Sequence, residues 1–214
     1  MVCEKIFRPT FLLSAIIVFA FVVRIMGIQY GLPLWLIDDE PPFALAALKM
    51  IQLKTILPVF HLEEFKNILY YPPYLSYIYL LPFSILLAVK YFFFQGGFDQ
   101  FLYYITNDLS QFFIIARFIN ILLGVATIGL LYRITKNIFQ NVYLSLLASF
   151  LLSTSLLHIL FSFIGRHWLP TSFLFTLTLF FLKHSQLIFQ EKIHLCITYC
   201  RDWNGNKHDC SSFA

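Results

Sequence analysis

The chain has 214 residues, of which 59% are hydrophobic and only 12% are charged, and its mean hydropathy is +0.76. Soluble domains carry about 25% charged residues, so this composition excludes an ordinary soluble protein and indicates an integral membrane protein. The formal net charge of +4 is small, and no polar segment combines a basic patch with stacking aromatic residues. The sequence therefore gives no sign of a nucleic-acid partner.

Apolar runs recur along the whole chain. A helix that crosses the hydrocarbon core of a bilayer needs about 20 apolar residues, and five runs approach this length: 10–23, 74–94, 112–132, 142–164 and 169–182. The first and last runs reach it if Arg24 and Lys183 extend their charged ends to the membrane surface. We therefore expect an all-α protein, a polytopic membrane helical bundle over residues 1–188, followed by a polar tail at 189–214.

The first apolar run follows Lys5 and Arg8, as in a signal peptide. No small-residue cleavage pattern follows the run, and Arg24 lies where a cleavage site would be. We interpret this segment as an uncleaved anchor.

An acidic cluster, Asp38, Asp39 and Glu40, comes shortly after the first run and is followed at once by two prolines. Proline is well tolerated in the first turn of a helix, so a helix is predicted over 43–53, lying along the membrane surface. The cluster has two interpretations. It is a site for chemistry on a polar substrate, or it is a solvated loop that caps the helix. The positive end of a helix dipole keeps such carboxylates ionised, which suits them to hold a cation or orient a hydroxyl.

The charges of the connecting segments predict a topology, because short loops rich in Lys and Arg stay cytoplasmic. The N-terminal segment, the link at 133–141 and the tail are basic and are expected inside. Residues 27–72 are net acidic and residues 95–110 contain acids but no Lys or Arg, so both are expected outside, as is the link around Arg166. This predicts a multi-pass protein of the cell membrane with a cytoplasmic N-terminus.

The run at 74–94 joins two outer segments and is therefore expected not to cross. Pro82 within it suits a bent or broken helix. This predicts four spanning helices, one half-inserted helix and surface-lying helices in the first outer loop. The alternative is that 74–94 crosses as a fifth span, because it is long enough.

Several motifs occur in a recognisable order between residues 8 and 185. They are Arg24, Gly27, Gly31-Leu32-Pro33, Asp39-Glu40, Tyr71-Pro72-Pro73, Arg117, His158 and Ser162. Together they resemble the N-terminal part of the GT-C polytopic membrane glycosyltransferases. The closest group is the one similar to protein O-mannosyltransferases, which use dolichyl-phosphate-mannose, and to lipid A aminoarabinose transferases.

The resemblance implies that a sugar is transferred from a polyprenyl-phosphate carrier to an acceptor on the non-cytoplasmic face, with inversion. It maps the family's catalytic acidic motif onto Asp39 and Glu40. Asp39 is our candidate base for the acceptor hydroxyl. Glu40 is the candidate orienting residue or metal ligand, so a divalent cation at Asp39 and Glu40 is the cofactor to test.

Three basic residues are candidate substrate-binding groups for the carrier phosphate: Arg166, His167 and Arg117. The planar guanidinium of arginine matches phosphate oxygens well. The other interpretation makes Arg166 and His167 an interfacial turn anchored by Trp168, with Arg117 reaching to the membrane edge. If the first holds, Asp39 and Glu40 should lie near Arg166 or His167.

Two features depart from the family pattern. The segment 162–170 lacks the second acid that many relatives carry, and the relatives are longer. We expect the unusual tail, 196–214, to mark a truncated or frame-shifted product with little activity of its own, or else a genuine cytoplasmic tail. The alternative function is a non-catalytic membrane scaffold or lipid-binding protein of the same fold. Cys196 and Cys200 lack the usual Cys-x2-Cys spacing of zinc sites, so no metal centre is predicted there.

Overall fold

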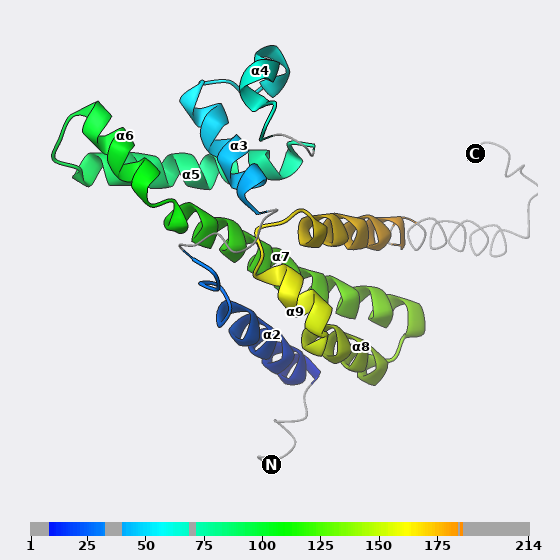
Figure 1. Cartoon of the computed structure of the whole chain (residues 1–214). Helices are drawn as coiled ribbons and strands as arrows, with labels where there is room; N and C mark the ends of the chain where they lie inside the picture. The colour runs from blue at the N-terminus through cyan, green and yellow to red at the C-terminus, as the bar shows by residue number, and fades with distance from the viewer. Residues whose placement is uncertain (1–8, 33–39, 69–71, 184, 186–214) are drawn as a thin grey trace, which may run out of the picture.

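A computed structural model describes residues 9–32, 40–68, 72–183 and 185, and within these residues every regular element is a helix (Figure 1). The prediction of an all-α protein is confirmed for this part of the chain. The elements are α2 (Pro9–Ile25), α3 (Pro41–Gln52), the 3-10 helix η1 (Pro58–His61), α4 (Leu62–Phe65), α5 (Tyr74–Phe93), α6 (Phe98–Asn107), α7 (Ser110–Phe139), α8 (Val142–Thr154), α9 (Leu156–Ser162) and a last helix, Trp168–Lys183.

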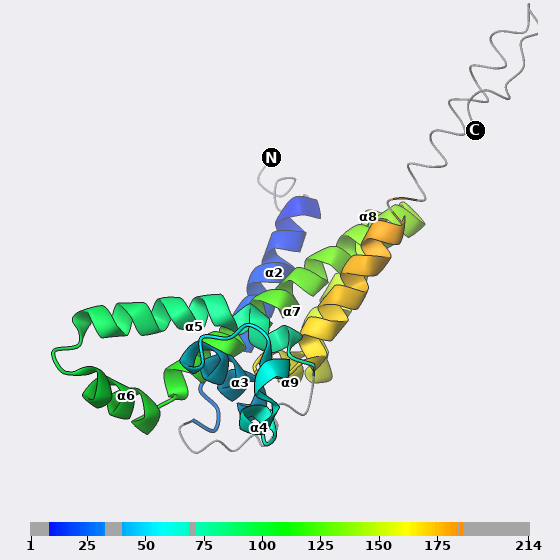
Figure 2. The same cartoon turned by 90° about the horizontal axis from the view of Figure 1, so that it is seen from above.

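The helices form two groups around the long helix α7. Helices α2, α8 and α9 pack along α7, whereas α3 to α6 gather near its beginning (Figures 1 and 2). The loop 163–167 lies where the two groups meet, and the last helix starts from it. The residues that link these groups are therefore the ones that build the candidate site.

Two described helices are long and apolar enough to cross a membrane, α5 and α7. The bent pair α8 and α9 makes a third if it counts as one span. Helix α2 and the helix Trp168–Lys183 are apolar but shorter. By length and composition the structure thus has two or three candidate spans.

Helix α7 is longer than its apolar run predicted. The expected link at 133–141 is wrong for most of its length, because the helix continues through Arg133 and Lys136 to Phe139. It ends at Gln140, which has the left-handed backbone angle φ 52° and whose N–H bonds the carbonyl of Lys136. The side chain of Asn141 then caps α8 by accepting from two backbone N–H groups. Thirty residues of helix measure about 45 Å, more than the hydrocarbon core of about 30 Å.

The run at 142–164 was predicted as one helix, but it is broken at Ser155 and bent by 61°. The hydroxyl groups of Ser153 and Thr154 both donate to the carbonyl of Phe150. Such bonds from Ser and Thr compete with the helical pattern and bend helices. The polar pair just before the break gives the physical reason for it.

Helices α3 and α5 form the core of the second group. The small residues Ala44 and Ala47 of α3 are buried and cluster with Leu75, Tyr79 and Phe83 of α5. The prediction that α3 begins at the proline pair is confirmed. Residues 74–94 were expected to form a bent or broken helix at Pro82; the break is wrong, because α5 continues through that residue as one helix.

The end of α2 lies beside the early part of α7. The Nη1 group of Arg117 donates to the carbonyls of Ile28 and Tyr30, each at 2.8 Å. Because Ile28 follows the end of α2 and Arg117 lies near the start of α7, the two packed helices run in opposite directions.

Candidate functional site

A buried ion pair forms the centre of the site. Glu40 immediately precedes α3, and only 3% of its side chain is exposed; Arg117 of α7 is 1% exposed. The guanidinium donates through Nε to Oε1 at 2.7 Å and through Nη2 to Oε2 at 2.6 Å. This two-point arrangement is the strong geometry for an arginine and a carboxylate, and it fixes the start of α3 against α7.

The same carboxylate also holds the loop 163–167. The backbone N–H of Gly165 donates to Oε1 of Glu40 at 2.8 Å. A Cβ atom at position 165 would lie 2.7 Å from that oxygen, so only glycine fits here without a shift. Together with the bonds from Arg117 to Ile28 and Tyr30, the ion pair joins three parts of the chain that are far apart in the sequence: residues 28–40, α7 and the loop 163–167.

Two further side chains fix the loop and were not predicted. Asn120 donates through Nδ2 to the carbonyls of Ile164 and Arg166, at 2.6 and 3.0 Å. The hydroxyl of Tyr74 donates to the carbonyl of His167 at 2.9 Å. In the sequence, Asn120 is a polar amide one helical turn after Arg117 in an apolar helix. Because buried polar groups need partners, this pattern was the signal by which the sequence could have identified it.

Arg166 and His167 lie on this loop beside aromatic rings. The Arg166 Cζ atom is 4.4 Å from the centre of the Trp168 ring, and the His167 ring centre is 5.4 Å from that of Phe43. Burial lowers the pKa of the Arg166 guanidinium. Burial, and then the charge of Arg166, lower the pKa of His167 below its usual 6.5, so this imidazole is neutral at pH 7.

The expected closeness of the acidic cluster and the Arg166 loop is confirmed for Glu40, which bonds Gly165, the residue before Arg166. Asp38 and Asp39 lie outside the described residues. Both oxygens of Glu40 are engaged by protein donors, which favours a positioning role over direct proton transfer. A metal ion on Glu40 would lie beside the Arg117 guanidinium, so the carboxylate does not fit the cation-ligand role in this conformation.

The position of Arg117 argues against its candidate role as a phosphate-binding residue. Its N–H groups bond Glu40 and two backbone carbonyls, and the side chain is fully enclosed. In this conformation the guanidinium is not presented to an outside phosphate. The geometry favours a structural role for Arg117.

Arg24 forms a second buried cluster next to the first. Its Nε donates to the Ser162 hydroxyl at 3.1 Å, and its Nη2 lies 2.8 Å from Nδ1 of His158. Its Nη1 donates to the carbonyls of Ala20 and Ser153. Two interpretations were open for Arg24, extension to the membrane surface or pairing with a polar group. The first is wrong, because the side chain is fully buried between helices, and the bonds to Ser162 and His158 agree with the second. Arginine only donates, so Nδ1 of His158 accepts and its Nε2 carries the proton.

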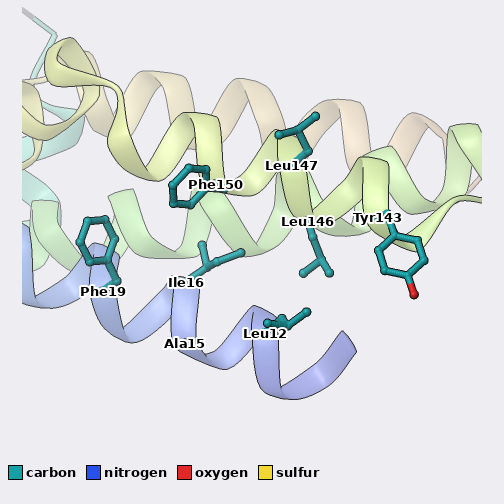
Figure 3. Close-up of a pocket in the computed structure, with 8 residues that line it drawn as sticks. All are labelled: Leu12, Ala15, Ile16, Phe19, Tyr143, Leu146, Leu147 and Phe150. Atoms are coloured by element: carbon teal, nitrogen blue, oxygen red, sulfur yellow. The ribbon is translucent and has the colours of Figure 1, made fainter. Parts of the chain in front are cut away.

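An apolar groove lies on the other half of α2. It has a volume of about 520 Å³ and runs between α2 and α8 (Figure 3). Its lining residues are Leu12, Ala15, Ile16, Phe19, Tyr143, Leu146, Leu147 and Phe150. No charged side chain is among them, so this groove suits a lipid chain and not the chemistry of a polar group.

Comparisons with family models, with curated proteins and with solved structures find no match for this chain. Within the described ranges, no group of three or more His, Cys, Asp and Glu residues is placed to hold a metal ion. Cys196 and Cys200 lie outside those ranges. The case for a function therefore depends on the Glu40–Arg117 pair, the loop 163–167 and the sequence motifs that meet there.

Proposed function

We propose that this chain is a polytopic membrane glycosyltransferase of the GT-C kind, which takes a sugar from a polyprenyl-phosphate carrier on the non-cytoplasmic face of the membrane. Its N-terminus is cytoplasmic, and its site comprises Asp39, the loop residues Arg166 and His167, and the Glu40–Arg117 pair, which holds that loop through Gly165.

One observation carries the proposal: among the described residues, polar members of the motifs that resemble the family bond one another across the fold. Glu40 and Arg117 are 77 residues apart and form an ion pair. Arg24 and Ser162 are 138 residues apart and share a hydrogen bond. Both clusters flank the loop 163–167. Buried polar groups need partners in any apolar helix, so pairing alone is not specific to a family. The support for the resemblance is that both pairs join residues of its motifs and lie beside the same loop.

The chemistry assigns one step to each group. Asp39 accepts the proton of the acceptor hydroxyl while its oxygen attacks the anomeric carbon. The bond from that carbon to the phosphate oxygen breaks, and the polyprenyl phosphate leaves with the bonding electrons. Arg166 contacts the leaving phosphate, because a guanidinium matches phosphate oxygens. Neutral His167 donates a hydrogen bond to the same phosphate.

Binding of the carrier tests the proposal. The protein in lipid nanodiscs should bind a polyprenyl-phosphate hexose, and free polyprenol should not compete. Arg166→Gln should weaken binding about 10-fold or more, since a hydrogen bond to a charged group contributes about 1.5–3 kcal/mol. Lys136→Gln, in the last turn of α7, is the matched control and should leave binding unchanged. Absence of phosphate-dependent binding, or equal binding by both variants, would rule the proposal out.

Transfer tests the role of Asp39 separately. Asp39→Asn keeps the shape of the side chain but removes the proton acceptor. In a form of the protein that transfers sugar, it should lower the rate of transfer by about 10²–10⁴-fold while leaving carrier binding intact. An unchanged rate would remove Asp39 from the catalytic role even if binding is confirmed.

The second candidate function is a non-catalytic scaffold or lipid-binding protein of the same fold. One observation favours it: the described carboxylate of the acidic cluster, Glu40, is fully engaged in holding segments together. Carrier binding that is insensitive to the phosphate would point to this alternative, as would occupation of the α2–α8 groove alone.

A further inference from the structure

We propose that α5 does not cross the membrane but lies in the outer interface, with one apolar face of the α5–α6 hairpin inserted among the phospholipid chains of the outer leaflet. This inference concerns the lipid contact of the first outer loop and does not depend on sugar transfer. It follows from the position of α5 on α7, from the length of α6 and from the side chains that α5 exposes.

The position of α5 is set by its contacts with α7. The ring of Phe83, in the middle of α5, lies 5.1 Å from the ring of Phe112. Phe112 precedes Arg117, which is level with the end of α2. Five residues of helix rise about 7.5 Å, so Phe112 lies about 7.5 Å before Arg117 along the axis of α7, beyond the end of α2. If α7 spans the bilayer, the middle of α5 is therefore at the membrane edge and not at its centre.

The length of α6 excludes a crossing and return. Helix α6 folds back on α5, as the ring contacts of Phe94 and Tyr91 with Phe101 show. Its ten residues measure about 15 Å, half of the hydrocarbon thickness of about 30 Å. If α5 crossed, α6 would return the chain only to the bilayer centre, and α7 could not begin beyond the end of α2.

The exposed face of α5 has the character of a lipid contact. Its buried face is formed by Leu75, Tyr79 and Phe83. The opposite stripe is exposed, carries no charge and repeats at helical spacing: Ile78, Leu81, Ile85, Val89 and Phe92. An apolar face of this extent, with Phe92 82% exposed, is unfavourable in water.

The end of the hairpin favours lipid over a protein partner. Lys90 lies over the ring of Tyr104, 5.3 Å from its centre, and Tyr91 and Tyr103 are exposed nearby. Tyrosine and lysine are the residues that collect at the boundary between headgroups and hydrocarbon. The hairpin also continues directly into α7, the longest candidate span.

The side on which the hairpin loop lies tests the inference. In a variant whose four native cysteines are replaced by serine, single cysteines are placed at Asn67, before α5, at Gln95, after α5, and at Lys136, and labelled with an impermeant thiol reagent in sealed vesicles. We expect Asn67 and Gln95 to label from the same side and Lys136 from the other. Labelling of Asn67 and Gln95 from opposite sides would mean that α5 crosses, and would overturn the inference.

The depth of the stripe is the second readout. A spin label at Ile85 should respond to oxygen more than to a water-soluble nickel complex, at a depth of about 5–10 Å below the headgroups. A label at Gln100, exposed on α6, is the control and should respond to the nickel complex. A depth at the bilayer centre for Ile85, or a water-exposed or protein-covered signal there, would contradict the lipid contact.

Discussion

Removing the charge of Glu40 should destabilise the fold strongly. In Glu40→Gln, the Arg117 guanidinium stays buried without its counter-charge, and the bonds at 2.7 and 2.6 Å lose their ionic partner. Removing one partner of a buried ion pair costs about 3–5 kcal/mol. In a chain of this size that corresponds to a fall in Tm of about 6–20 °C, at about 2–4 °C per kcal/mol. Thermal unfolding in detergent, followed by circular dichroism and tryptophan fluorescence, measures it.

The chain provides a matched control for this substitution. Lys49 and Glu64 form an ion pair at 3.0 Å, but their side chains are 26% and 46% exposed. Glu64→Gln should therefore cost less than about 1 kcal/mol. Arg117→Met combined with Glu40→Gln should cost less than the sum of the single changes, by about 1–3 kcal/mol. Equal Tm values for Glu40→Gln and Glu64→Gln would refute the assignment of Glu40 as the link between segments.

Three further predictions concern the same region. Gly165→Ala should lower stability by about 1–3 kcal/mol, because its Cβ would overlap Glu40. Gly129→Ala is the control: its Cβ meets open space, and the change should raise stability by up to about 1 kcal/mol. A higher Tm for Gly165→Ala than for Gly129→Ala would contradict this. Arg24→Lys should cost about 1–3 kcal/mol, since an ammonium cannot reach the four acceptors of the guanidinium; an unchanged Tm would show that the charge alone suffices. The folded-state pKa of His167 is lowered, so its contribution to stability is present above about pH 6.5 and is lost as the pH falls through the folded-state value. His167→Gln should therefore lose less Tm than the unmodified protein between pH 7 and pH 5. An identical loss of Tm in the two proteins would disprove this role of His167.

The sequence predicted the helices better than their ends. The proline pair at 41 and 42 correctly marked the start of α3, because proline fits the first turn of a helix. Apolar composition could not reveal the break at Ser155, which depends on hydroxyl groups bonding backwards to Phe150. Nor could it show that α7 continues through basic residues to Phe139, since charge marks a membrane edge and not a helix end.

The pairing of polar groups was less predictable than their presence. Glu40 and Arg117 were each identified, but as groups that act on a substrate, and the sequence offers no direct sign that residues so far apart bond each other. The usable signal was physical: a lone charge in an apolar helix needs a buried partner of opposite sign. Gly165 and Asn120 were missed because their roles depend on backbone positions that only the folded loop defines.

Photo-crosslinking of a polyprenyl-phosphate hexose that carries a light-activated group next to the phosphate tests the central claim most directly. The proposed site predicts labelled peptides from the loop 163–167 and from the acidic cluster that ends at Glu40. Unlabelled polyprenyl phosphate should suppress this labelling, and free polyprenol should not. Labelling confined to the α2–α8 groove, or competition by polyprenol alone, would contradict a phosphate-binding site at the outer edge of the membrane.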